Sequence, residues 1–471
     1  MLFNSLEFLL FFPSVALVYF LLPKVSWRNL FLLLASFYFY MNWKPVFALL
    51  LLGSVVVTYG CGLLLKKNEG HKKKKKWILT ISLLLNFGCL FVFKYFNFFN
   101  GAIYSALDYF GLRWSVPNLD ILLPVGISFY TFMAVGYCID VYRGTIKAER
   151  NFITYALYVS FFPQICAGPI GRAKDLIPQL KEKRAFSYDM VSSGVKMMLW
   201  GYFMKLCIAD QLCVYVDAVF NNIPHHNGTT IAFASLMFTI QIYCDFAGYS
   251  LIAIGTAKAM GIELMENFHR PYFSTSMKEF WKRWHISLSS WFMEYLYFPL
   301  GGNRVPYWRN LTNLMIVFLV SGIWHGANWT FILWGALHGL FVVSENVWTK
   351  IRGKKTYTQW YIRLPKILVC FVLASFAWMF FRANSVSDVF LAIEKMFTES
   401  GALFFDRNTL IIGLASALLL LVKDVVDEYN LKLRLLNSKL PVVRYASFVI
   451  LLSFVLMFGA MGGGQFIYFQ F

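Results

Sequence analysis

Residues 321–339 read SGIWHGANWTFILWGALHG and place two histidines, His325 and His338, in a stretch without formal charge. The uncharged stretch runs from residue 310 to residue 344, which is 35 residues. As one helix it would be roughly 50 Å long, whereas the hydrocarbon core of a bilayer is about 30 Å thick. We therefore expect a bend, and Gly322 and Gly326 offer one beside His325. The bend would place His325 where two short apolar halves meet.

Apolar segments recur along the whole chain. Of its 471 residues, 59% are hydrophobic and 14% are charged, and the mean hydropathy is +0.58. This composition predicts an all-α polytopic membrane protein with a single membrane domain over residues 1–471. Candidate spans, with the two halves around His325 counted as one unit, lie near 6–22, 28–44, 45–65, 77–97, 121–142, 190–219, 230–257, 311–348, 365–381, 408–422 and 443–459.

Lysines set the expected orientation. The loop 66–76, KKNEGHKKKKK, holds seven lysines, and short loops rich in Lys and Arg stay in the cytoplasm. Counting spans from this loop places the N-terminus outside and puts no basic cluster on the exterior. The net charge of +19 is then explained by cytoplasmic loops and membrane lipid, and we expect no nucleic-acid partner.

The eight cysteines lie in or beside apolar runs, and none forms a CxxC pair. Buried small residues are the simplest interpretation, so we expect no disulfide framework, no metal site and no permanently bound cofactor. Cys166 lies in a segment broken by Pro and Gly, but no histidine neighbours it in sequence, which makes it a weak nucleophile candidate.

His325 has two interpretations. A polar side chain at membrane depth is a functional candidate, but a histidine can also bond a backbone carbonyl and merely hold helices together. Trp324 and Asn328 lie beside it in sequence, and the glycines allow a substrate to approach, so we favour function. For His338 both interpretations stay open.

Residues 276–298, SMKEFWKRWHISLSSWFMEYLYF, have aromatic and basic character. Spacings of four and three put five apolar residues on one helical stripe: Phe280, Trp284, Leu288, Trp291 and Tyr295. With Lys278, Lys282 and Arg283 nearby, the pattern predicts one amphipathic helix in the membrane interface. His285 falls one residue off the stripe, with Trp281 at i−4.

A second irregular region, YVSFFPQICAGPIGR, covers residues 158–172. Pro and Gly free backbone groups, which is tolerable at membrane depth only inside protein or along a wet cavity. A re-entrant loop and a kinked span or cytoplasmic loop are both compatible with it.

A buried neutral imidazole suits one kind of chemistry. Histidine is the usual general base near neutral pH, and desolvation keeps it neutral. We see no Ser–His–Asp arrangement and no metal spacing, so the simplest chemistry is activation of a hydroxyl that attacks an activated acyl group. His285 would orient or polarise the acyl carbonyl.

At these residues the sequence resembles the membrane-bound O-acyltransferase family, and within it the bacterial alginate O-acetyltransferase branch. The resemblance rests on motifs that occur in order within about residues 120–340 and is weak over 385–471. These are LPVGISFYTF (123–132), IDVYRG (139–144), FFPQICAGPIGR (161–172), DFAGYS (245–250), ENFHRPYFSTSMKEFWKRWHISLSSW (266–291), LGGNR (300–304) and WHGANW (324–329).

The resemblance implies a ring of about 11 transmembrane helices around a central funnel or tunnel, with interfacial and re-entrant helices. It implies His325 as the catalytic residue and His285 as its partner. Further substrate or tunnel candidates, most of them within these motifs, are Trp281, Trp284, Arg283, Ser289, Trp324, Asn328, His338, Asp245, Tyr249, Pro163 and Gln164.

By the same resemblance, the protein is expected in a bacterial cell membrane as a multi-pass enzyme. The expected donor is acetyl-CoA or another coenzyme A thioester, or an acyl carrier protein, on the cytoplasmic side. The expected acceptor is an exported cell-surface polysaccharide, reached through an exterior partner protein that receives or transfers the acyl group.

The chain departs from the branch at two places. Met293-Glu294 stands where the branch usually has Arg-Asp, and Leu251 stands where it often has Asp. DFAGYSL is closer to proteins that transfer D-alanine toward teichoic acid, which is the first alternative. A transporter without acyl chemistry is the second; Asp210 and Asp245 should then matter more than His325.

Overall fold

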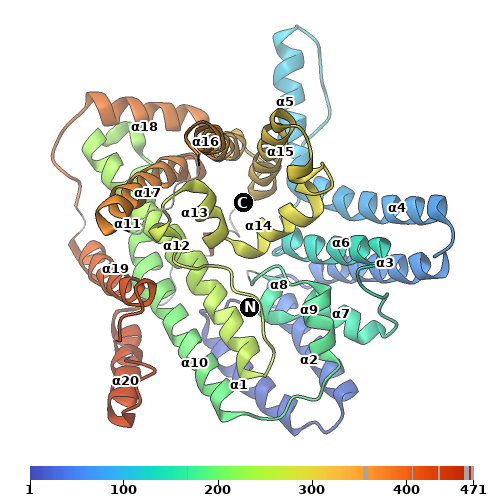
Figure 1. The fold of residues 1–471 in the computed structure, drawn as a ribbon. Helices are drawn as coiled ribbons and strands as arrows, with labels where there is room; N and C mark the ends of the chain where they lie inside the picture. Colours follow the sequence, from blue (N-terminus) through green and yellow to red (C-terminus); the bar gives the residue numbers. More distant parts are fainter. Residues whose placement is uncertain (167, 354–358, 406, 433–434, 461–465, 468–471) are drawn as a thin grey trace. The chain divides into compact units, whose positions relative to one another are not determined.

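The computed structural model contains helices and, among the residues it describes, no strands (Figure 1). It describes the whole chain except residues 167, 354–358, 406, 433–434, 461–465 and 468–471. The chain divides into two compact units, residues 1–192 with 256–265, and residues 193–255 with 266–471. The expectation of a single membrane domain stays a prediction.

The first unit holds the N-terminal helices. They are α1 (Leu6–Leu21), α2 (Val25–Met41), α3 (Phe47–Lys67), α4 (Lys72–Leu90), α5 (Phe96–Tyr109), α6 (Ile127–Arg143), α7 (Phe152–Ser160), α8 (Phe162–Ile165) and α9 (Ala173–Leu180). A π-helical turn over Phe91–Tyr95 joins α4 to α5. Side chains cap two of these helices, since Ser5 accepts from Phe8 N and Asn151 from Thr154 N.

The second unit carries the histidines that the sequence singles out. Its helices include α11 (Asp210–Phe220), α13 (Met277–Arg283), α14 (Ile286–Phe292), α15 (Tyr307–His325), α16 (Trp329–Arg352), α17 (Trp360–Arg382), α18 (Val386–Thr398), α19 (Arg407–Glu428) and α20 (Pro441–Phe458). Two further helices carry the chain from one unit to the other, α10 (Tyr188–Tyr202) and α12 (Gly228–Ala259).

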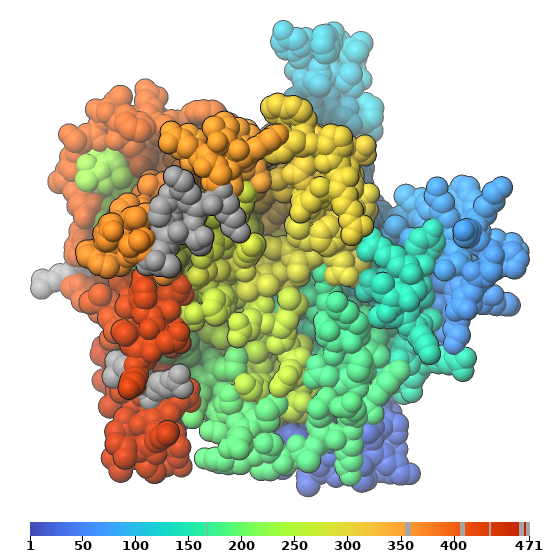
Figure 2. All heavy atoms as spheres, viewed as in Figure 1, coloured from blue at the N-terminus to red at the C-terminus, as the bar shows by residue number. Residues whose placement is uncertain are grey.

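Helices occur at every expected span, and six are long and apolar enough to cross a membrane. These are Phe47–Lys67, Lys72–Tyr109, Gly228–Ala259, Trp329–Arg352, Trp360–Arg382 and Pro441–Phe458. Only 6% of α20 is buried, and its red atoms are seen at the lower left of Figure 2. An apolar helix this exposed needs lipid around it. The protein is therefore an all-α membrane protein; the count of about 11 spans and their ring arrangement stay predictions.

The prediction of one continuous helix over 276–298 is wrong. The segment forms α13 and α14, separated at Trp284 and His285, and then a π-helical turn over Met293–Tyr297. His285 has a left-handed backbone with φ of 43°. A residue in this conformation interrupts a right-handed α-helix. The five apolar residues of the predicted stripe are all buried in protein. The prediction failed because tertiary contacts at the break outweigh helical periodicity.

The segment 158–172 is broken, as its prolines and glycines predict. Helix α7 ends at Ser160 and α8 spans four residues, Phe162–Ile165. A Cβ on Gly168 would lie 2.4 Å from Gln164 Cα, so only glycine fits there. The described residues of this segment are buried within the first unit, where Gln164 Nε2 donates to Tyr158 O at 2.9 Å.

Candidate functional site

His325 is the last residue of α15, at the turn of a tight helical hairpin. Helix α16 begins four residues later, so the uncharged stretch bends at His325 as predicted. Two glycines let the helices approach: a Cβ on Gly322 would lie 2.4 Å from Phe331 O, and one on Gly335 would lie 2.4 Å from Phe318 O. Small residues at such a contact allow two backbones to pack closely.

One hydrogen bond sets the tautomer of His325. Its Nδ1 lies 2.6 Å from Ser321 O, and the ring is 2% exposed. A carbonyl oxygen can only accept, so Nδ1 must carry the hydrogen. In the neutral ring the lone pair then resides on Nε2, which is the form that a general base requires.

His285 is held where the chain breaks between α13 and α14. Residues 267–269 run beside the break and bond its backbone, since His269 N donates to Arg283 O and Ile286 N donates to Asn267 O, both at 2.9 Å. These bonds replace the helical hydrogen bonds that the break removes. Backbone groups on both sides of the left-handed His285 therefore have partners.

Asn267 fixes the ring of His285. Its Oδ1 lies 3.0 Å from His285 Nδ1 and also accepts from Ser287 N and Ser287 Oγ. A backbone N–H can only donate, which identifies the acceptor atom as oxygen and makes His285 Nδ1 a donor. His285 therefore has the same tautomer as His325. Asn267 Nδ2 in turn donates to Ser250 Oγ at 3.2 Å.

The two rings are neighbours in an aromatic environment. The centroids of His285 and His325 are 6.5 Å apart with an interplanar angle of 78°. Trp324 lies 6.0 Å from His285 and 5.0 Å from His325, and Phe246 lies 4.6 Å from His285. Burial, with His325 as a smaller cause, lowers the pKa of His285 well below its ordinary value. Burial therefore favours the neutral form of His285.

His338 belongs to the same aromatic cluster but has different surroundings. Trp334 lies 4.7 Å from His325 and 4.9 Å from His338, so one indole contacts both histidines. Further rings around His338 are those of Phe280, Trp281, Phe318, Phe341 and Trp378. Within the described residues, neither ring nitrogen of His338 has a hydrogen-bond partner. The ring is thus packed as a side chain of the aromatic core.

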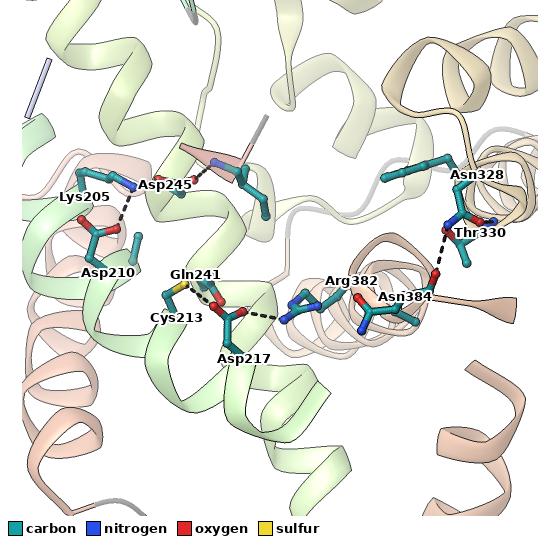
Figure 3. A pocket seen from close by; sticks show the side chains of 14 residues that line it. Lys205, Asp210, Cys213, Asp217, Gln241, Asp245, Asn328, Thr330, Arg382 and Asn384 are labelled. Atoms are coloured by element: carbon teal, nitrogen blue, oxygen red, sulfur yellow. Dashed lines mark hydrogen bonds and ion pairs between the residues drawn. The ribbon is translucent and has the colours of Figure 1, made fainter. Parts of the chain in front are cut away.

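A polar cavity of about 290 Å³ lies beside the hairpin turn (Figure 3). On one side Lys205 Nζ lies 2.7 Å from Asp210 Oδ1 and 2.5 Å from Asp245 Oδ1. On the other side Arg382 pairs with Asp217 at 2.6 Å. We call Lys205, Asp210 and Asp245 the ion triad, and we call this cavity the triad cavity. Asn328, three residues after His325, also lines it.

A second cavity of about 340 Å³ reaches Asn267, the hydrogen-bond partner of His285, and Ser250, which accepts from Asn267. Asn267 and Ser250 line it together with residues of α10 and of the end of α19, such as Lys196 and Lys423. We call it the Asn267 cavity. The Asn267 cavity is thus lined by the hydrogen-bond partner of His285, and the triad cavity by Asn328, three residues after His325.

Comparison with known proteins identifies the family of the chain. The family model described as "MBOAT, membrane-bound O-acyltransferase family" matches residues 146–386, a range that contains both histidines. A "Probable alginate O-acetylase" of Azotobacter vinelandii is 37% identical over 433 residues, covering 92% of this chain and 85% of that protein.

The chain belongs to the membrane-bound O-acyltransferase family.

It is also similar to a peptidoglycan O-acetyltransferase of Helicobacter pylori, 34% identical over 437 residues, covering 85% of this chain and 80% of that protein. A teichoic acid D-alanyltransferase of Bacillus subtilis is 27% identical over 249 residues, covering 50% of this chain and 62% of that protein. The protein is thus an O-acyltransferase, and the resemblance inferred from its motifs is confirmed.

Several predicted site residues of this acyltransferase have structural partners. Arg283 pairs with Glu428 at 2.9 Å and with Glu279 at 2.7 Å. Ser289 Oγ donates to Trp284 O at 3.4 Å, and Asn328 caps α16 by accepting from Thr330 N. Trp281 and Trp284 pack in the aromatic cluster, the first against His338 and the second against Trp378.

The remaining predicted residues have other contacts in the second unit or belong to the first unit. Asp245 belongs to the ion triad, and Tyr249 stacks on Phe466 at 4.6 Å. Pro163 and Gln164 belong to the buried α7–α8 segment of the first unit.

Sequence reasoning missed two important residues, Lys205 and Asn267. Lys205 lies in a π-helical turn, Phe203–Ala209, whose wider winding lets it reach Asp210 five residues later. The signal available in the sequence was a lone Lys and Asp inside an apolar run. Asn267 stands in the quoted ENFHRP motif, but its bond to His285 joins residues 18 apart in a loop, which no periodicity predicts.

Proposed function

We propose that this enzyme moves an acyl group, in the first instance acetyl, from a thioester donor to hydroxyl groups of an exported cell-surface polysaccharide, with His325 as general base. The observation that carries the proposal is the 2.6 Å bond from His325 Nδ1 to Ser321 O, because it leaves the Nε2 lone pair as the proton acceptor. The names of the similar alginate and peptidoglycan enzymes support acetyl as the acyl group and a polysaccharide as the acceptor.

The proposed step is a direct acyl exchange. His325 Nε2 takes the proton of the acceptor hydroxyl while its oxygen attacks the acyl carbon. The acyl–sulfur bond breaks, and the proton passes from the imidazolium to the departing thiolate, which leaves as a thiol. The products are an ester and free thiol, and His325 returns to its neutral form. General-base catalysis of this kind contributes roughly 10²–10⁴-fold to a rate.

His285 supports this step as a positioning residue in the proposal. With Nδ1–H committed to Asn267, a neutral His285 offers only an acceptor at Nε2. It would have to be protonated to polarise a carbonyl, and burial lowers its pKa well below the ordinary value. In this proposal His285 positions the acceptor hydroxyl or the ring of His325 and does not polarise the acyl oxygen.

The two cavities suggest which substrate enters where. The orientation argued from the lysine loop puts residues 258–310 and 423–444 inside, and residues 220–229 and 382–407 outside. Lining residues of the Asn267 cavity include Arg270 and Asn437, from the inside segments. The triad cavity is lined by Ala383 and Asn384, which belong to the outside segment 382–407. We therefore assign the thioester end of the donor, a coenzyme A thioester or an acyl carrier protein, to the Asn267 cavity.

The acceptor is assigned to the triad cavity, which is polar and lined by side-chain amides and carboxylates. An exterior protein that presents or receives the acyl group would meet the enzyme on this side. The proposed location is a bacterial cell membrane with the N-terminus outside.

The test compares envelope polysaccharide from cells that carry the wild-type enzyme, His325→Ala or His225→Ala. His225 is exposed and serves as a matched control. Mild base releases ester-linked acyl groups, which are then identified, and membrane abundance is measured for each variant. We expect acetate to be lost only with His325→Ala.

Other outcomes would redirect the proposal. Loss of D-alanine in place of acetate would move the enzyme to teichoic-acid chemistry, in keeping with the similarity to the Bacillus subtilis protein. Normal acylation by His325→Ala at full abundance would refute the general base.

A further inference from the structure

A groove of about 1200 Å³ lies in the second unit, lined by residues of α13, α16 and α17. It does not include the histidines or either cavity described above. Residues at the end of α16, including Trp348 and Arg352, line it together with residues near the start of α17, including Lys366 and Val369. Both helices are candidate membrane spans, Trp329–Arg352 and Trp360–Arg382. A groove at the ends of two spans lies where lipid headgroups meet the hydrocarbon.

The charge of the groove is positive. Its lining contains four basic side chains, Lys278, Lys282, Arg352 and Lys366, and two acidic ones, Glu279 and Glu345. Both carboxylates already have partners in the protein. Glu279 pairs with Arg283 at 2.7 Å, and Glu345 Oε2 accepts from Lys278 N at 3.1 Å. With four basic and two acidic side chains, the lining of the groove carries an excess of positive charge.

The same groove has an apolar side. Met277, Phe341, Val369 and Leu373 line it, and Val369 is 59% exposed. Arg352 lies over the ring of Trp348 at 4.6 Å, and Trp348 is itself 59% exposed. Exposed Trp beside Arg and Lys at the end of a span is typical of the membrane interface. A ligand for this groove must join an anionic head to an apolar chain.

We propose that this groove, called the α16–α17 groove, binds one anionic phospholipid. Its phosphate would meet Lys282, Arg352 and Lys366, and an acyl chain would lie along Val369 and Leu373. Basic pockets at the ends of membrane helices recognise anionic lipid headgroups in this way. The proposal does not depend on the acyl-transfer chemistry.

The test uses the full-length enzyme, purified in a neutral detergent. Its thermal unfolding and its bound lipid, counted by native mass spectrometry, are measured with phosphatidylglycerol, phosphatidylcholine or soluble glycerol phosphate. Lys282→Gln with Arg352→Gln removes two charges of the groove. Lys72→Gln with Lys73→Gln removes two charges from the exposed start of α4 and is the matched control.

Phosphatidylglycerol is expected to stabilise the wild type and the control and to remain bound to both. At about 1 kcal/mol per basic residue, the groove variant should bind it roughly 30-fold more weakly. Equal effects of phosphatidylglycerol and phosphatidylcholine would overturn the proposal, as would equal losses in both variants. An effect of glycerol phosphate equal to that of the lipid would leave the apolar side without a role and also overturn it.

An acidic protein is the alternative occupant. If the groove variant loses binding of an acidic acyl carrier protein while phosphatidylglycerol binding is unchanged, the groove is a protein dock and the lipid assignment is wrong.

Discussion

The ring centroids of His285 and His325 lie 6.5 Å apart. Each ring donates its Nδ1 hydrogen to an oxygen, His285 to the side chain of Asn267 and His325 to the backbone of Ser321. In their neutral forms both rings therefore carry the lone pair on Nε2. One oxygen belongs to the ring's own helix, whereas the other belongs to a loop 18 residues away. Substitutions can therefore disturb His285 without touching His325.

Asn267→Leu should reduce acyl transfer by roughly 10–100-fold. The substitution removes the acceptor for His285 Nδ1 and Ser287, and an unsatisfied buried donor costs about 1–3 kcal/mol. Steady-state kinetics in membranes would show the loss mainly in kcat. Asn267→Asp keeps an acceptor and adds a negative charge, which should move the acid limb of the pH–rate profile relative to the wild type. An unchanged profile in Asn267→Asp would show that this contact only supports the fold.

The stability of the enzyme should depend on pH through His285. Burial lowers its folded-state pKa, so protonation favours the unfolded chain. Stability is then highest above the unfolded pKa of about 6.5 and falls as pH decreases below it, by up to about 1.4 kcal/mol per pH unit. Thermal unfolding between pH 7.5 and 5.5 would measure this, and His285→Asn should show a shallower decrease. Identical slopes for the two proteins would contradict the assignment of a neutral buried ring.

Gly322→Ala should destabilise the α15–α16 hairpin by about 1–3 kcal/mol, because the new Cβ would lie 2.4 Å from Phe331 O. The hairpin carries His325, so activity should fall with the fraction of folded enzyme. Gly60→Ala is the control, since its Cβ would meet nothing within 4 Å in helix α3. Alanine there should be neutral or slightly stabilising. Fluorescence-detected size exclusion after heating would rank the variants.

Lys205→Met should be among the most damaging substitutions outside the histidine site. It leaves Asp210 and Asp245 buried together without their cation, and breaking a buried ion pair costs about 3–5 kcal/mol. The same substitution at Lys423, which pairs with Asp427 at the surface, should cost less than about 1 kcal/mol. Folded yield and melting temperature would be compared for both. A mild effect of Lys205→Met would indicate that the carboxylates are protonated or reach water.

His338→Phe should keep most of the acyl-transfer activity, within a few-fold of the wild type. Aromatic rings surround His338 and its ring nitrogens have no hydrogen-bond partner in the described structure, so an aromatic side chain of similar shape fits its surroundings. His325→Phe should abolish transfer under the same conditions. If His338→Phe is as inactive as His325→Phe while folding normally, His338 takes part in the chemistry.

The amino-acid sequence alone determined the helical membrane class, the approximate place of the apolar spans and the bend at His325. These follow from local properties, since a run of apolar residues can bury its backbone in lipid only as a helix, and 35 uncharged residues exceed one bilayer crossing. The motifs also singled out both histidines, and the family comparison confirmed the resemblance on which that choice rested.

Only the tertiary structure decided the break at His285, the bond to Asn267 and the Lys205 ion triad. In each case, contacts between residues outweigh a local conformational preference. A loop bonds the backbone on both sides of the left-handed His285, and a π-helical turn aligns Lys205 with Asp210. Helical periodicity predicted a continuous amphipathic helix over 276–298. That prediction assumes that every backbone group forms its hydrogen bond within the same helix. At the histidine site the loop at residues 267–269 supplies those bonds, and this difference positions His285 next to His325.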